Sequence, residues 1–178
     1  MNKQLAISQM SPALLAGFTK WDKMMADNKL SYILTCVART YKEQVAIYAQ
    51  GRESYEHVNQ YRAIAGMSPM TFDKTEYAKA ITKPGNNKFT ISWTMNSKHI
   101  VNPDDMRLDN DKSNAFDFAV ITHGILTYDI KANTNDNQIN DYIEAGGYAV
   151  QVGLRSGKDF KNAKGQPKPD YPHIEVVS

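Results

Sequence analysis

The sequence of 178 residues contains little cysteine, little net charge and no long apolar run. Its single cysteine, Cys36, excludes an internal disulfide and every zinc site built on several thiolates, so we expect any metal site to use histidine and carboxylate. A formal net charge of +2 is too balanced to indicate nucleic acid binding by itself. No run approaches the ~20 apolar residues of a membrane helix, and the first residues lack the apolar core of a signal peptide. The composition predicts one folded domain over residues 1–178.

The predicted helices and strands interleave irregularly, which favours the α+β class. Ser11 and Pro12 form a good helix start, and apolar residues at helical spacing then predict a helix over about 12–28. Thr40 and Glu43 have the spacing of a capping box, which predicts a helix over about 41–50. Further helices are expected at 55–65, up to Ile81 and at 137–152; strands at 31–38, 88–94, 115–122, 126–130 and 173–177; and loops at 100–114 and 155–171.

Three short segments contain the residues best suited to chemistry. They are Ser97-Lys98-His99, the segment 114–118 with Asp117, and Asp170-Tyr171-Pro172-His173-Ile174-Glu175. Two imidazoles and one carboxylate suit Zn²⁺, and three protein ligands leave a fourth position open. We therefore predict His99, Asp117 and His173 as the metal ligands.

A zinc hydrolase also needs a carboxylate to move protons. Asp170 lies three residues before His173, and the prolines around it could turn it to the same side. Glu175 lies two residues beyond His173, on the same face of a strand, as a supporting residue or as the alternative base.

In this order, the segments resemble the M15 family of zinc peptidases. That family contains D-alanyl-D-alanine carboxypeptidases and dipeptidases, and phage endolysins that are L-alanyl-D-glutamate peptidases. Its pattern is Ser-x-His-x-x-Gly-x-Ala-x-Asp, followed late in the chain by an acidic residue three before a second histidine. Ser97 with His99, Ala115 with Asp117, and Asp170 with His173 match it, and the Asp-x-Pro-His-x-Glu form at 170–175 is most similar to the endolysin branch.

Three further segments carry the resemblance. Residues 37–44 and 46–52 resemble the family's Tyr-Arg-Ser-x-x-x-Gln and Leu-Tyr-x-Gln-Gly-Arg, and residues 153–160 resemble Gly-Leu-x-Trp-Gly-Gly-Asp-Trp. The resemblance implies that Arg39 binds the substrate carbonyl or the oxyanion, with Gln44 in a supporting place. Ser97 would be either a supporting hydrogen-bond donor or a simple turn residue. The implied fold is a small antiparallel sheet that carries the metal site and is flanked by helices.

The sequence departs from the family pattern between the first histidine and the aspartate. The family separates them by seven positions, whereas 18 positions separate His99 from Asp117. The inserted loop, about 100–112, makes Asp105 a rival for the third ligand. Asp109, Asp111 and Ser113 at alternate positions could bind Ca²⁺, although a solvated acidic loop is the simpler interpretation.

The resemblance implies one Zn²⁺ and, as substrate, the peptide stem of bacterial peptidoglycan. The leading hypothesis is a phage endolysin that cuts between L-Ala and D-Glu, monomeric, made in the host cytoplasm and released to the wall through a holin. The alternatives are a D-Ala-D-Ala carboxypeptidase or dipeptidase and a non-catalytic wall-binding module. Cys36 is interpreted as a small buried apolar residue, and His57 and His123 as residues outside the site.

Overall fold

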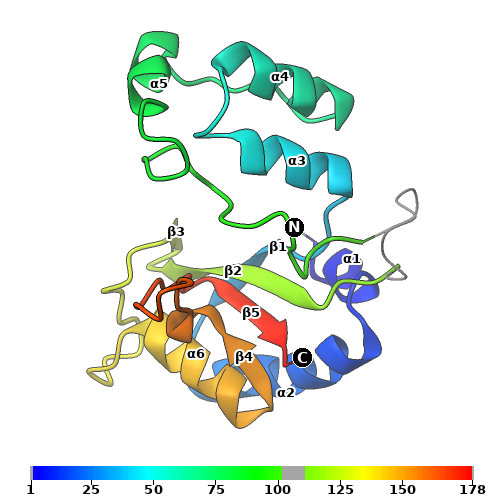
Figure 1. The fold of residues 1–178 in the computed structure, drawn as a ribbon. Coiled ribbons are helices and arrows are strands. Elements are labelled where there is room, and N and C mark those ends of the chain that lie inside the picture. The colour runs from blue at the N-terminus through cyan, green and yellow to red at the C-terminus, as the bar shows by residue number, and fades with distance from the viewer. Residues whose placement is uncertain (1, 102–110, 178) are drawn as a thin grey trace. The chain divides into compact units, whose positions relative to one another are not determined.

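The chain is described by a computed structural model over residues 2–101 and 111–177. It divides into two compact units, which are described separately below. The first consists of Met1–Ala38 and Lys112–Ser178, and the second of Arg39–Asp111. The colours of Figure 1 follow the chain through both.

The first unit is built on an antiparallel sheet. Its strand order is β1 (Tyr32–Cys36), β2 (Ala115–Thr122), β5 (His173–Val176) and β4 (Leu154–Ser156), and β3 (Ile125–Thr127) also pairs with β2. His123 and Gly124, both with positive φ, make the tight turn between β2 and β3. The α+β class with a small antiparallel sheet is therefore confirmed.

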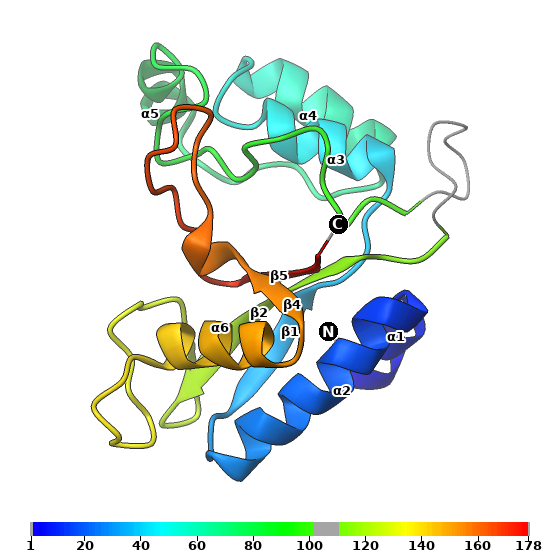
Figure 2. The same cartoon turned by 60° about the horizontal axis from the view of Figure 1, so that its bottom comes forward.

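Two helices cover one face of this sheet. Helices α2 (Pro12–Asp27) and α6 (Asp141–Gln151) lie side by side there, as Figures 1 and 2 show, and the short helix α1 (Lys3–Ser8) precedes them. Trp21 at the centre of the core contacts the rings of Phe18, Phe116 and Phe118. Since side chains alternate along a strand, this packing assigns Phe116 and Phe118 to the helix side and turns Asp117 to the opposite face.

The second unit is helical. It contains α3 (Tyr41–Ala49), α4 (Tyr55–Ile64) and α5 (Lys74–Ala80). The predicted capping box at the start of α3 is present, since Thr40 and Glu43 exchange side-chain and backbone hydrogen bonds. These helices and the chain segments between and after them bury a small apolar core. It consists of Ala49, Val58, Met70, Tyr77 and Phe89.

The strand predicted at 88–94 is wrong. These residues form turns and extended chain with no strand partner among the described residues. The alternating apolar pattern was misleading because only Phe89 is buried, whereas Ile91 and Trp93 are exposed.

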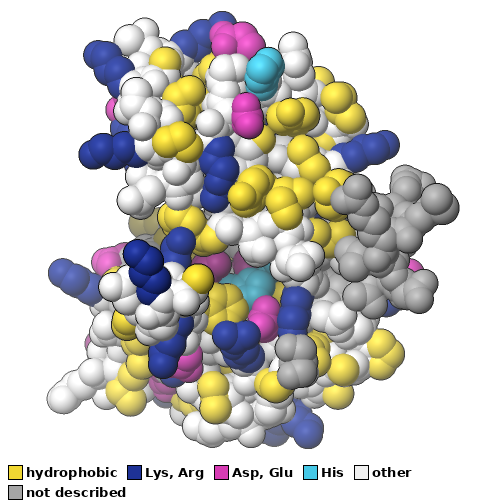
Figure 3. Space-filling model, in the orientation of Figure 1, with side chains coloured by type: hydrophobic (Ala, Val, Ile, Leu, Met, Phe, Trp, Pro, Cys, Tyr) yellow, Lys and Arg dark blue, Asp and Glu magenta, His cyan; other side chains and the backbone are white. Residues whose placement is uncertain are grey.

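Smaller differences concern the edges of other elements. Helix α6 begins at Asp141 rather than near 137, and the loop predicted at 155–171 contains part of β4 and a 3-10 turn, η1 (Gly157–Asp159). Helix α1 was not predicted. Lys and Arg side chains are spread over the face that Figure 3 draws and, among the described residues, do not gather into one patch. None of the helices in the described part of the chain has the length and apolar character needed to span a membrane.

Candidate active site

The polar face of the sheet carries three of the predicted site residues on two paired strands. Asp117 on β2 is the direct antiparallel partner of His173 on β5. Paired residues point to the same side of a sheet, and so do residues two apart on one strand, which adds Glu175. The structure thus brings Asp117, His173 and Glu175 to one face of the sheet.

His173 lies between two carboxylates. Its Nδ1 is 3.0 Å from Asp117 Oδ1 and its Nε2 is 3.1 Å from Glu175 Oε2. The side chains of His173 and Glu175 are only 10% and 9% exposed. A neutral imidazole carries one N–H, so it can donate to only one of the two carboxylates. The arrangement therefore favours a positive charge on this face, either a second proton on the ring or a bound cation.

An arginine and an aromatic ring also lie near His173 and Glu175. Arg155 Nη1 lies 3.2 Å from Glu175 Oε1, and the Arg155 guanidinium lies over the Phe160 ring, 4.6 Å from its centroid. The Phe160 ring in turn lies 5.4 Å from that of His173. Glu175 is thus held from both sides, which makes it a residue that orients the imidazole.

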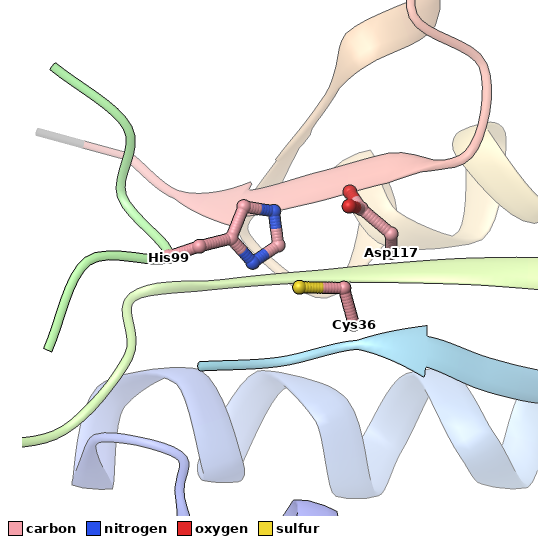
Figure 4. A group of neighbouring side chains, drawn as sticks. All are labelled: Cys36, His99 and Asp117. Carbon is pink, nitrogen blue, oxygen red and sulfur yellow. The ribbon is translucent and has the colours of Figure 1, made fainter. Parts of the chain in front are cut away.

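Cys36 does not match the interpretation as a buried apolar residue. It is partly exposed, and its sulfur belongs to a group with ligand atoms of His99 and Asp117 that all lie within 4.8 Å of one another. Figure 4 shows these three side chains together. The cause is a bulge in β1: Leu34 pairs with Phe118, but Cys36 pairs with Asp117, so the extra residue turns Cys36 to the polar face.

The backbone around His99 is held by its neighbours in the second unit. The His99 carbonyl accepts a hydrogen bond from the Arg39 N–H at 3.0 Å, and the His99 N–H donates to Ser97 Oγ at 3.3 Å. Ser97 thus accepts a hydrogen bond from the backbone of the turn that contains His99. Arg39 also forms an isolated β-bridge with Ile100, the residue after His99, within the second unit.

Gln44 orients the side chain of Arg39. Its buried amide accepts from Arg39 Nη1 at 3.2 Å and donates to Ser92 Oγ at 2.9 Å and to the Thr94 carbonyl at 2.6 Å. The helix start at Thr40 and one turn of α3 place Gln44 opposite Arg39. Arg39 and Gln44, which are five residues apart in the sequence, are thus in direct contact.

Asp170 is positioned by its backbone. Its N–H donates to the Gly157 carbonyl at 2.8 Å, and its carbonyl accepts from the His173 N–H at 3.0 Å. A Cβ on residue 157 would lie 2.1 Å from the Asp170 carbonyl oxygen. Only glycine allows the two backbone segments to approach so closely. In the sequence, the one indication of this requirement was the resemblance of residues 153–160 to the family's glycine-containing segment.

The donor set fits a zinc ion. Tetrahedral zinc with nitrogen and oxygen ligands sets neighbouring ligand atoms roughly 3–3.5 Å apart, close to the Asp117–His173 distance of 3.0 Å. Two sets of possible ligands can be distinguished: the pair of Asp117 and His173, and the group of Asp117, His99 and Cys36. Asp117 is thus the residue common to both.

Most of the inserted loop predicted at about 100–112 is not among the described residues. Asp105 and Asp109 lie outside the described residues. Ser113 is fully buried, and its hydroxyl contacts the Val37 and Ala115 carbonyls at 2.6 and 2.8 Å, so it serves the backbone rather than a cation. The other histidines lie elsewhere: His57 is beside Glu53 on the surface, and His123 is in the β2–β3 turn.

The comparisons with known proteins give a likeness of fold. No family model matches the sequence, and no curated protein matches it. Among solved structures, the chain is similar to the L-Ala D-Glu endopeptidase ChiX of Serratia marcescens, with a TM-score of 0.50 and 10% sequence identity. The match covers 98% of this chain and 85% of that chain. At this identity the likeness establishes a similar fold.

Proposed function

We propose that this protein, whose fold is similar to that of an L-Ala D-Glu endopeptidase, is a zinc-dependent peptidase of the M15 type. Its substrate would be the peptide stem of bacterial peptidoglycan, cut between L-Ala and D-Glu, as by a phage endolysin. The observation that carries the proposal is the pair of Asp117 and His173, 3.0 Å apart on the polar face of this sheet.

His99, Asp117 and His173 would hold the metal. Bound there, zinc would polarise the scissile carbonyl and supply water with a lowered pKa. Glu175 would keep the His173 ring oriented, because it contacts Nε2 and is itself tied to Arg155.

Asp170 would move the protons of the reaction. Its carboxylate would take a proton from the attacking water and return it to the leaving amine. This role requires a constant position relative to His173, which the two backbone hydrogen bonds of Asp170 supply.

Arg39 would stabilise the negative charge that develops on the carbonyl oxygen. A guanidinium carries several N–H donors in a fixed plane, and Nη1 of Arg39 binds Gln44. Gln44 would hold the guanidinium plane before substrate arrives, so that its orientation costs little during the reaction.

The test is a digest of purified sacculi, with the new ends identified by mass spectrometry. New D-Glu amino ends, lost in chelator and restored by one Zn²⁺ per chain, support the proposal. Free D-Ala would reassign the protein as a carboxypeptidase, and binding to sacculi without any cleavage would leave a wall-binding module.

A matched pair of variants tests the residue roles. Asp170→Asn should lower kcat by 10²–10⁴-fold while zinc remains bound. Asp159→Asn, the same change at an exposed aspartate, should leave turnover unchanged.

The same proposal includes release from the host cytoplasm through a holin and a monomeric state. A lysis assay with and without a holin tests the release, and size-exclusion chromatography tests the monomeric state.

A further inference from the structure

The loop before α6 has a second pattern of oxygen-bearing residues, separate from the site above. Asn133, Asn135, Asn137, Asp141 and Glu144 occupy positions 1, 3, 5, 9 and 12 of a twelve-residue stretch. This is the spacing of a helix-linked calcium loop, in which a residue at position 6 must turn sharply. That sixth residue is Gln138, with a φ of 67°.

A buried carboxylate in this loop lacks a partner for one of its oxygens. Asp141 is fully buried; its Oδ1 accepts from the Thr134 N–H at 3.0 Å, but its Oδ2 has no hydrogen-bond partner. Two more oxygens of the loop, Asn133 Oδ1 and Thr134 Oγ1, are likewise buried without a partner. Burial of a carboxylate oxygen and an amide oxygen without donors is costly, and a cation bound by Asp141 and Asn133 would satisfy both.

Glu144 is surrounded by groups that could change their role on metal binding. Its Oε2 accepts from the side-chain amides of Asn135 and Asn137 at 3.1 and 2.8 Å, and its Oε1 contacts the Tyr148 hydroxyl. A half-turn of each amide would present its oxygen instead of its nitrogen. The only basic residue between 129 and 144 is Lys131.

We propose that this loop binds one Ca²⁺ ion through Asn133, Asp141 and Glu144, with Asn135 and Asn137 completing the oxygen shell. The ligands are all oxygens, with neither imidazole nor thiolate, which selects a hard cation over zinc. Calcium accepts six to eight such oxygens in flexible geometry, whereas Mg²⁺ demands a near-ideal octahedron.

Calcium bound there would stabilise the beginning of α6 and, through it, the backbone that holds Asp170. Helix α6 packs closely on β4 and η1, since a Cβ on Gly146 would lie 2.6 Å from Ser156 Oγ. The next residue, Gly157, holds the Asp170 backbone. The ion would thus stabilise the position of Asp170 through α6 and Gly157, without contacting the substrate.

Thermal unfolding of the zinc-loaded full chain tests the proposal without any substrate. Ca²⁺ at a hundredfold excess over its Kd should raise the unfolding temperature by roughly 5–10 °C, and the same concentration of Mg²⁺ by less. Isothermal titration should give one Ca²⁺ per chain. Absence of a Ca²⁺-dependent shift would overturn the site. Because no turnover is measured, this result is independent of whether the protein cleaves peptidoglycan.

Variants of matched charge locate the ion. Asp141→Asn should abolish the Ca²⁺ shift and, in calcium-free buffer, unfold at the same or a higher temperature, because the unpartnered charge is gone. Asp136→Asn, at an exposed position between the ligands, should keep the shift. Glu144→Gln is the second test if Asp141→Asn fails to fold. A shift that survives in folded Asp141→Asn or Glu144→Gln refutes the proposal.

Discussion

Replacement of Gly157 by alanine is expected to displace Asp170 without touching its side chain. The added Cβ would lie 2.1 Å from the Asp170 carbonyl oxygen and 3.0 Å from His173 Cβ. Real Cβ contacts below 3.0 Å essentially do not occur, so the Asp170 backbone must withdraw by about 1 Å.

Two magnitudes follow from this displacement. Overpacking of this kind costs about 1–3 kcal/mol, which lowers the unfolding temperature by roughly 2–12 °C. A misplacement of 1 Å in a catalytic group lowers the rate by about 10²-fold. We therefore expect Gly157→Ala to remain folded at 25 °C and to bind one zinc, but to lose about 10²-fold in kcat/KM.

The assay is release of amino ends from sacculi, with zinc content and unfolding temperature measured on the same sample. Gly147→Ala is the matched control, since nothing lies within 4 Å of its added Cβ and a helical Gly→Ala change stabilises by about 0.5–1 kcal/mol. Full activity in folded Gly157→Ala would refute the reasoning that the backbone places Asp170 for catalysis.

Further predictions concern the metal, the arginine and the core. Cys36→Ala should keep one zinc per chain and activity within a few-fold, because a catalytic zinc site keeps its fourth position open and so does not use Cys36 as a ligand. Loss of zinc from this variant on dialysis would contradict the prediction. Asp117→Ala, by contrast, should lose the metal. Gln44→Leu should lower kcat more than it raises KM and cost about 1–3 kcal/mol, as read from steady-state kinetics and urea unfolding. Burial raises the pKa of Tyr142 to about 12, above that of the unfolded chain. The stability it contributes is therefore complete below pH 10 and lost as the pH rises toward 12, and Tyr142→Phe should flatten that part of a melting-temperature profile.

The elements best predicted from the sequence are those whose signal is local. The starts of α2 and α3 depend on caps at Ser11 and Thr40 that act within one turn, and the structure contains both. The sequence placed Asp117 and His173 together as metal ligands because each lies in a recognisable motif, whereas the pairing of their strands, β2 with β5, was not predicted.

The parts that could not be predicted depend on partners distant in the sequence. The expected placement of Cys36 failed because strict alternation along β1 would keep it on the side of Leu34, and nothing in the sequence signals the bulge between them. The segment at 88–94 has strand-like residues, but the Gln44 side chain binds the Thr94 carbonyl and, among the described residues, no strand pairs with the segment. Tertiary contacts override local propensity in both cases.

The second unit is an insertion between two strands that are neighbours in the sheet of the first. The insertion is flanked by Ala38 and Lys112 of the first unit. The residues next to these two are in contact, since Ser113 Oγ donates to the Val37 carbonyl at 2.6 Å. The scaffold can therefore exchange this insert as a module while β1 and β2 stay in register. Arg39, Gln44 and His99 all lie in this insert, so in the proposed enzyme an exchange of the insert would replace one metal ligand and the oxyanion donor together.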